Sequence, residues 1–464
     1  MTSCTHALAV FAHELTADHL PEPVRRQLRL HLVDALGCGW AASATEVGTL
    51  ARSAAHWLGD GPCHVWGAAR RHAPMAAAFA NALIINGLDH DDGVEIEGKG
   101  LGHPGATLVA AALAALDAAA QPVSGARFLA ALAAGFEVNN RLIHALQPSA
   151  ESFAQAYGVA QHQAIGAAVV AGSLWGLDAE GLHQAMGLAA TLSAVPSLHK
   201  YNWQERPLVT LKDGVAPAAQ AGIQAAGLVQ LGFVGSRDVL DGAQGYWRMR
   251  GSDRFDEQAL LHGLGQHWFI GYGSFKRYPA CRWLAAALEA LEAIASRTGW
   301  PADEMAAIEV ASFARLAEDF MDADPAQATD AQFSLPYTLA AVAHRLPPGP
   351  AWYAADTWAR ADLRATAQRV RASVDPALDA RMSGADRQPG ARVTVRHRDG
   401  RQATEARAQP QGSAARPLAD EAIIAKACRN VAGRIADPRG WVQALLGEDC
   451  WRRPLAGSLD LLGA

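Results

Sequence analysis

Apolar residues recur along the first two thirds of the chain with the spacing of α-helices. After Pro23, apolar side chains lie four residues apart between Val24 and Leu36, which places them on one face of a helix. Pro23 suits the first turn of this helix, and Gly37 and Gly39 suit its end. Many helical segments are rich in alanine and glycine on several faces, which predicts a multilayered bundle. Further helices are predicted at residues 74–85, 105–119, 124–145, 160–175 and 215–231.

The pattern changes near Gly263. Residues 263–283 are rich in glycine and aromatic side chains and have little helical period, which is typical of a connection between domains. Residues 305–313 contain β-branched side chains and predict a strand. Residues 391–408 alternate apolar and polar positions before an Asp399-Gly400 turn, which predicts a hairpin. From Pro417 the helical spacing returns, and we expect the last helices to pack against the first ones.

Composition narrows the class of protein. The 464 residues carry 40 lysines and arginines against 46 aspartates and glutamates, and the net charge of −6 disfavours nucleic-acid binding. No apolar run is long enough for a membrane span, and we expect no signal peptide because a basic amino-terminal region is missing. The six cysteines show no CxxC spacing, so we expect reduced thiols in a cytoplasmic protein.

The densest polar segment spans residues 86–107. It contains Asp89, His90, Asp91 and Asp92 in succession, and His103 then precedes the next predicted helix. Free N–H groups at a helix start attract anions, so His103 is placed where an anionic substrate can dock. Two alternatives stay open at this point. The aspartates can serve as helix caps, or the aspartates and histidines can bind a metal ion.

Three further segments carry side chains suited to carboxylate binding. Lys212 stands just before a predicted helix, where a cation is unfavourable unless an anion is bound nearby. Lys276, Arg277 and Arg282 lie within seven residues and can clamp carboxylates. Tyr337 precedes an alanine-rich helix. The structural alternatives are solvated surface cations at the first two segments and a core aromatic side chain at Tyr337.

Together and in this order, the polar segments resemble the MmgE/PrpD family, whose members include 2-methylcitrate dehydratase, cis-aconitate decarboxylase and iminodisuccinate epimerase. The resemblance runs over nearly the whole chain. Each segment alone is a weak signal, and their order and spacing make the assignment specific. The segments are VDALGCGWAA (33–42), NGLDHDDG (86–93), HPGAT (103–107), LKDGVAPAAQAGI (211–223), FKRYPACRW (275–283) and DAQFSLPYTLAA (330–341).

The resemblance implies a mainly α-helical protein, with a large all-helical domain and a smaller inserted α/β lid domain. The helical domain would comprise residues 1–266 and 409–464, and the lid would comprise residues 267–408. The resemblance also implies a homodimer that needs no cofactor and no metal ion. Its substrate would be a small polycarboxylate bound in the cleft.

Family site positions carry over onto this chain one at a time. Gly93 stands where the family has a threonine, and Gly105 stands where it has a serine. Tyr157 stands where many members have a catalytic histidine, with His162 five residues later as an alternative. Another usual histidine corresponds to Ala285. The implied catalytic residues are Asp89, His103, Tyr157, Lys212 and Tyr337. The implied substrate-binding residues are Asp92, Gly93, His162, Lys276, Cys281 and Arg282.

Proton transfer at a carbon next to a carboxylate is the chemistry that this resemblance implies. The developing negative charge needs cations placed in advance, which Lys212, Lys276 and Arg282 can supply. His103, with Asp89 as its partner, is the predicted acid or base. We therefore predict a lyase, either a dehydratase of the 2-methylcitrate type or a decarboxylase of the cis-aconitate type. An epimerase of an iminodisuccinate-type substrate is the alternative enzyme.

Two interpretations from other classes stay open. The string from Asp91 to Glu95 has the DDxxE form of terpenoid synthases, which hold magnesium and a diphosphate. Those proteins also carry a second metal motif downstream, and Asn139-Asn140 lacks the residues that would complete one. The departures at Gly93 and Tyr157 also allow an inactive or repurposed helical binding protein.

Overall fold

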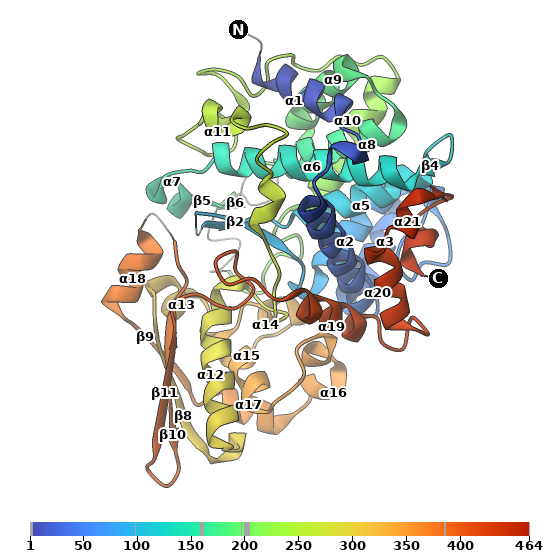
Figure 1. Ribbon diagram of the computed structural model, residues 1–464. Coiled ribbons are helices and arrows are strands. Elements are labelled where there is room, and N and C mark those ends of the chain that lie inside the picture. The colour runs from blue at the N-terminus through green and yellow to red at the C-terminus, as the bar shows by residue number, and fades with distance from the viewer. Residues whose placement is uncertain are drawn as a thin grey trace.

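The computed structural model describes residues 3–97, 99–157, 162–195, 197–198, 205–384 and 387–463. Helices dominate these residues, as predicted, and the main sheet lies in the second half of the chain. Figure 1 shows a helical region above and an α/β region below. The helices of the first region are α1 (Cys4–Glu14), α2 (Glu22–Ala42), α3 (Glu46–Leu58), α4 (Pro74–Ile85), α5 (Pro104–Asp117), α6 (Gly125–Ala145), α7 (Ala150–Gln155), α8 (Gln163–Trp175), α9 (Ala179–Leu192), α10 (Val215–Gln230) and α11 (Glu257–Leu261).

Four helices form the centre of the helical region. Helices α4 and α8 each pack against α5 and α10, which also contact each other, and α5 is buried at every position from Pro104 to Leu116. A helix that is apolar on all sides must be surrounded by other elements to leave water. The predicted multilayered bundle is therefore confirmed, and the predicted limits of α4, α6 and α10 agree closely with the structure. The amino-terminal end predicted for α8 falls partly on residues 160–161, outside the described residues.

Helix α2 corrects one prediction. It does not end at Gly37 and Gly39 but continues through both of them to Ala42. A β-carbon at Gly39 would lie 2.7 Å from the ring of Trp66, and one at Gly37 would lie 3.3 Å from the backbone of Ala427. Both glycines are therefore needed for close packing on two sides of a helix that continues past them. In the sequence, glycines at such positions look the same whether they end a helix or allow close packing inside it.

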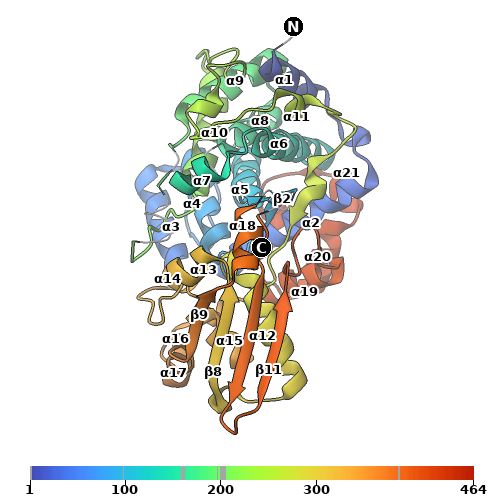
Figure 2. The ribbon, with the colours of Figure 1, turned by 90° about the vertical axis from the view of Figure 1, so that its left-hand side faces the viewer.

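The α/β region is built on a four-stranded sheet with the order β11-β10-β8-β9. The predicted strand is β8 (Met305–Ser312), and the predicted hairpin is β10 (Ala391–His397) with β11 (Gln402–Arg407). Strand β10 is antiparallel to both neighbours, and β9 (Val370–Val374) is parallel to β8. Helix α12 (Ala285–Thr298) packs on β10, β11 and α15 (Leu335–Ala343), as Figure 2 shows. The remaining helices of the region are α13 (Ala314–Asp319), α14 (Ala328–Ala331), α16 (Ala355–Trp358), α17 (Ala361–Ala367) and α18 (Pro376–Ser383).

The carboxy-terminal helices pack against helices of the first region. Helices α19 (Asp420–Asn430) and α20 (Pro438–Leu446) pack against α2, and α21 (Asp449–Arg452) packs against α6. Strand β12 (Pro454–Leu455) pairs with β4 (Val123–Ser124), and α22 (Leu459–Leu462) follows. Figure 1 shows these red helices beside the blue helix α2. Among the described residues, no helix combines the length and the apolar character that crossing a membrane requires.

A three-stranded sheet joins the helical region to the start of the α/β region. Strand β2 (Gly93–Ile96) lies between β3 (Lys99–Leu101) and β7 (Gly273–Ser274). Gly93 pairs with Ser274, so the chain that follows β7 runs beside the aspartate-rich segment that precedes β2. This pairing brings two of the predicted site segments together. The other short strands are β1 (Asp60–Cys63), β5 (Ala156–Tyr157) and β6 (Ser197–Leu198).

Candidate active site

Asp89 lies at the centre of a buried polar cluster. Helix α4 runs into a short 3-10 turn, η2 (Asn86–Leu88), and Asp89 then takes φ 49°, a left-handed conformation that aspartate tolerates. One carboxylate oxygen, Oδ1, lies 3.1 Å from Lys212 Nζ and 2.8 Å from Lys276 Nζ. Lys276 also donates to the backbone carbonyl of Asp89 at 3.0 Å. The turn thus places one carboxylate between two ammonium groups from distant parts of the chain.

The electrostatics of this cluster follow from its burial and from its pairing. Burial favours the neutral form of Asp89, but Lys212 and Lys276 outweigh it and hold the pKa of this carboxyl well below its ordinary value. Burial also disfavours the charged form of Lys212, yet Asp213 and Asp89 raise the pKa of its ammonium group. Both groups are therefore charged at neutral pH. The alternative of a solvated surface lysine is wrong for Lys212 and for Lys276, since both are buried.

His103 lies between two carboxylates at the start of α5, as its predicted position at a helix start requires. Its Nδ1 is 3.1 Å from Asp91 Oδ2, and its Nε2 is 3.7 Å from Asp213 Oδ2. Asp213 also contacts Lys212 Nζ at 2.5 Å. The backbone N–H of His103 donates to the side chain of Gln163 at 2.9 Å. The Asp91 carboxylate can only accept a hydrogen bond, so Nδ1 of His103 is placed to donate to it.

Two of these neighbours correct the predicted arrangement. Asp91, rather than Asp89, holds the ring of His103, because Asp89 is occupied by the two lysines. Asp213 was not predicted to be a site residue. Its charge and its place directly after Lys212 in the sequence were the available signal. The side-chain amide of Asn86, also unpredicted, donates to Asp91 at 3.2 Å and its oxygen accepts from Lys212 at 3.1 Å.

Asp92 holds the backbone of the site. Its Oδ1 accepts from the N–H of Gly105 at 2.8 Å, and its Oδ2 lies 2.5 Å from His31 Nδ1. A β-carbon at Gly105 would lie 2.8 Å from this carboxylate, so a side chain at position 105 would require Asp92 to shift. Asp92 therefore links α2, the aspartate-rich segment and the first turn of α5. His31 lies among the apolar residues of α2, where no sequence signal marked it.

The segment after β7, which contains Lys276, Cys281 and Arg282, forms one side of the site. Burial raises the pKa of the Cys281 thiol to about 12, and the nearby Asp89 adds to this effect. The thiol is therefore neutral. The Nη1 atom of Arg282 is paired with Glu95 and donates to Ser274 Oγ at 2.7 Å. A side chain at Gly93 would overlap the guanidinium of Arg282. Lys276, Cys281, Arg282 and Gly93 are thus brought to one place.

The other predicted residues lie in different surroundings. The hydroxyl of Tyr337 donates to the carbonyl of Trp352 inside the core of the α/β region, and burial raises its pKa to about 12. These contacts are those of a core aromatic side chain, the alternative named for it. Burial, followed by the charge of Arg250, holds the pKa of His162 well below its ordinary value, so this ring is neutral. The backbone of Tyr157 lies in β5, and its side chain falls outside the described residues.

A second buried pair supports the site from behind. Lys426 of α19 lies 2.7 Å from Asp34 of α2 and also donates to the backbone carbonyl of His90. Burial raises the pKa of Asp34 to about 6, against the opposing charge of Lys426. Burial and then Lys426 lower the pKa of His90, which is neutral. The carboxy-terminal helices therefore hold the aspartate-rich segment in place.

Ligating atoms of Asp89, Asp91 and His103 lie within 4.8 Å of one another, so the metal alternative has a geometric basis. The ammonium groups of Lys212 and Lys276 already neutralise Asp89, and a metal ion would have to displace them. The DDxxE interpretation fits less well. Its three carboxylates face different partners, because Asp91 contacts His103, Asp92 contacts His31, and Glu95 contacts Arg282.

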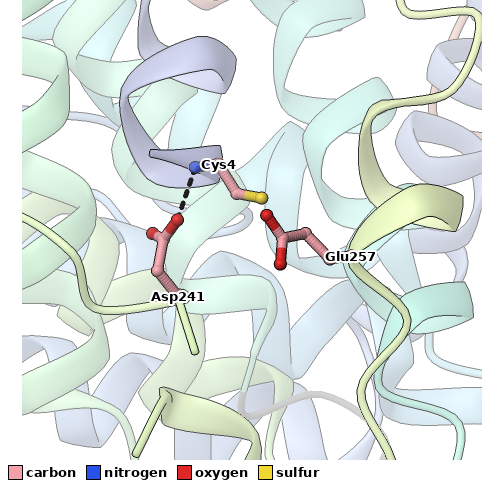
Figure 3. A group of neighbouring side chains, drawn as sticks. All are labelled: Cys4, Asp241 and Glu257. Carbon is pink, nitrogen blue, oxygen red and sulfur yellow. Dashed lines mark hydrogen bonds between the residues drawn. The ribbon is translucent and has the colours of Figure 1, made fainter. Parts of the chain in front are cut away.

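A second group with ligand spacing lies at the start of α1, far along the chain from the site. Figure 3 shows Cys4, Asp241 and Glu257, whose ligating atoms also lie within 4.8 Å of one another. Asp241 is already engaged as a helix cap, since it accepts from the N–H of Cys4 at 2.5 Å and from the hydroxyl of Thr5 at 2.6 Å. Burial and then Glu257 raise the pKa of the Cys4 thiol to about 12. This arrangement is that of a protonated thiol beside a cap.

Comparison with known proteins finds two family models that together match most of the chain. The MmgE/PrpD N-terminal domain matches residues 6–258, and the MmgE/PrpD C-terminal domain matches residues 278–448. The chain therefore belongs to the MmgE/PrpD family, a family of dehydratases and decarboxylases.

Several relatives are cis-aconitate decarboxylases. The human enzyme is 27% identical over 318 residues, which is 65% of this chain and 63% of the relative. The mouse enzyme is 25% identical over 322 residues, covering 66% and 62% of the two chains. The enzyme of Aspergillus terreus is 23% identical over 303 residues, covering 63% and 60%. These alignments span less than two thirds of the relatives' own length.

Proposed function

We propose that this protein is a lyase that removes a carboxyl group from a small unsaturated tricarboxylic acid of the cis-aconitate type. The observation that carries the proposal is the buried cluster in which Lys212 and Lys276 flank Asp89 while His103 stands between Asp91 and Asp213. This cluster combines fixed positive charge with one proton donor. The decarboxylase relatives point in the same direction.

The small number of acid and base groups favours decarboxylation over dehydration. Dehydration needs a base at the carbon and an acid at the leaving hydroxyl, whereas decarboxylation needs only a donor for the carbon. Glycine replaces the family threonine at position 93, and the family histidine positions correspond to Tyr157 and Ala285. Cys281 is a neutral thiol. Among the described side chains at the Asp89 cluster, His103 is the one imidazole, and Lys212 and Lys276 already donate to Asp89 and Asp213.

The proposed reaction proceeds in two steps. The bond between the methylene carbon and its carboxylate breaks, carbon dioxide leaves, and the electron pair forms an allylic anion with the neighbouring double bond. The negative charge spreads through this system onto the carboxylate at its far end, where Lys212 and Lys276 stabilise it. A proton on Nε2 of His103 then passes to the carbon beside that carboxylate, the double bond shifts by one position, and solvent reprotonates the ring. Asp91 holds the ring in position and stabilises its charged form. No cofactor and no metal ion enters this scheme.

Proton NMR in deuterium oxide tests the reaction. The protein is dialysed against EDTA and incubated separately with cis-aconitate, citrate, 2-methylcitrate and iminodisuccinate. We expect a decarboxylated product from cis-aconitate with one deuterium on the carbon that receives the proton. The His103→Ala variant serves as the control and should form product roughly 10²- to 10⁴-fold more slowly. Loss of water from citrate or 2-methylcitrate would identify a dehydratase, and deuterium exchange without bond cleavage would identify an epimerase.

Two further outcomes decide the remaining alternatives. Activity that disappears on EDTA dialysis and returns with one divalent metal ion would overturn the metal-free scheme. Absence of turnover and of binding across the whole panel would favour a repurposed helical protein. We also propose a cytoplasmic homodimer, which sedimentation of the purified protein and fractionation of its host cells test directly.

A further inference from the structure

Gly93 stands at the end of the aspartate-rich segment, where the family has a threonine, and it has no side chain. Gly93 is buried and starts β2 directly after Asp92. A β-carbon placed there would overlap Nη2 of Arg282 and lie 3.0 Å from its Cζ. The guanidinium of Arg282 therefore occupies the space that a side chain at position 93 would fill. The missing hydroxyl is replaced by a cation from another part of the chain.

Arg282 is held firmly in this space. Its Nη1 is paired with Glu95 and donates to Ser274 Oγ at 2.7 Å. The second oxygen of Glu95 accepts from the backbone N–H of Ala414 at 2.9 Å, so the carboxylate is itself fixed. In contrast, Nη2 of Arg282 is buried and has no hydrogen-bond partner among the described residues. A buried donor without a partner is costly, and such groups are commonly satisfied by a ligand or by water.

The unpartnered Nη2 atom lies close to the chain segments that carry the Asp89 cluster. Gly93 follows Asp89 by four residues, and the carbonyl of Gly102, just before His103, lies 3.3 Å from the position of the added β-carbon. Arg282 also follows Cys281, whose thiol feels the charge of Asp89. The guanidinium is thus bordered by the segments that carry Asp89 and His103.

We propose that Nη2 of Arg282 binds a second substrate carboxylate, and that Gly93 determines this specificity by leaving room for the guanidinium. The inference rests on the proposed function and deepens it. Lys212 and Lys276 stabilise the charge that develops on one retained carboxylate, and Arg282 selects substrates with a further carboxylate. Arginine suits this task because its planar group stays charged and donates in a fixed direction.

A double-mutant cycle tests the proposal by ligand binding, without turnover. Calorimetry measures the affinity for tricarballylate, a saturated tricarboxylate, and for butyrate, a monocarboxylate. Gly93→Ala leaves every charge in place and displaces only the end of the arginine side chain. We expect Gly93→Ala and Arg282→Met each to weaken tricarballylate binding roughly 10- to 100-fold, as for loss of a hydrogen bond to a charged group. The double variant should bind no more weakly than Arg282→Met alone, and butyrate affinity should not change.

The matched control is Gly271→Ala. Gly271 is exposed, and a β-carbon there would meet nothing within 4 Å, so this variant should bind tricarballylate like the wild type. Wild-type affinity in Gly93→Ala would overturn the proposal, and so would additive losses in the double variant. If Arg282→Met does not fold, the tricarballylate affinities of Gly93→Ala and Gly271→Ala are compared instead. A wild-type protein that binds no tricarboxylate would refute the proposed function itself, whereas equal binding by wild type and variants refutes only the role of Arg282.

Discussion

At the scale of single residues, His103 is the group on which the proposed proton transfer depends. Removing it should lower kcat by roughly 10²–10⁴, the usual contribution of a positioned acid or base. KM should change far less if chemistry limits turnover. Initial rates on the substrate identified by NMR measure both constants for His103→Ala. The control is His56→Ala, because His56 is an exposed residue of α3. A His103→Ala enzyme with full kcat would assign the proton to another group.

Asp89 is the residue whose charge the cluster stabilises most directly. Its pKa is lowered in the folded protein, so the native state binds fewer protons than the unfolded state in acid. The stability that it contributes is therefore present above its ordinary pKa of 3.8 and is lost as the pH falls through the folded value.

The variant Asp89→Asn tests this dependence on pH. It leaves Lys276 buried without its carboxylate, and we expect a loss of about 3–5 kcal/mol at neutral pH. The melting temperatures of the wild type and of Asp89→Asn are measured between about pH 7 and pH 3. The difference between them should be largest at neutral pH and should become smaller in acid. A gap that stays constant across this range would mean that Asp89 is not the group that titrates.

At the scale of elements, α2 depends on a glycine for its packing. Gly39→Ala brings a methyl group within 2.7 Å of the Trp66 ring, so we expect a loss of about 1–3 kcal/mol from overpacking. Gly227→Ala is the matched control in α10, where the nearest atom of Trp175 lies 3.8 Å away. There alanine should stabilise the helix by up to about 1 kcal/mol. Urea unfolding of both variants measures the two changes, and a stable Gly39→Ala protein would contradict the packing argument.

At the scale of the whole molecule, the carboxy-terminal helices hold the site through Lys426. Removing its ammonium group leaves Asp34 buried without a partner, which should cost about 3–5 kcal/mol. The pKa of Asp34 is already raised to about 6 by burial, and loss of Lys426 raises it further. When folding raises the pKa of a carboxyl group, its contribution to the free energy of unfolding is fully present below the pKa of the unfolded state. That contribution is lost as the pH rises. The cost of Lys426→Met should therefore grow above about pH 6.

The double variant Asp34→Asn with Lys426→Met provides the control. It removes both charges, so most of the lost stability should return, and the dependence on pH should disappear. The carbonyl of His90 still loses its donor in this variant. We therefore expect kcat to stay reduced even where the melting temperature recovers. Full activity in the double variant would show that Lys426 does not position the aspartate-rich segment.

Much of the architecture follows from local sequence patterns. Helical spacing predicted α4, α6 and α10, and alternation with a turn predicted the hairpin of β10 and β11, because these elements need only near neighbours. The same patterns misplaced the end of α2. Gly37 and Gly39 are compatible with a helix stop and also with close packing, and only the positions of Trp66 and Ala427 distinguish the two.

The sequence by itself determined the fold class, the family, and the segments that carry Asp89, His103, Lys212 and Lys276, because these rest on residue types and their order along the chain. Only the tertiary structure decided which of these groups touch. It paired Asp89 with the lysines, gave His103 to Asp91 and Asp213, and placed Arg282 over Gly93. Partners of buried charges come from helices and strands far apart in the chain, and their pairing depends on packing, which no local pattern records.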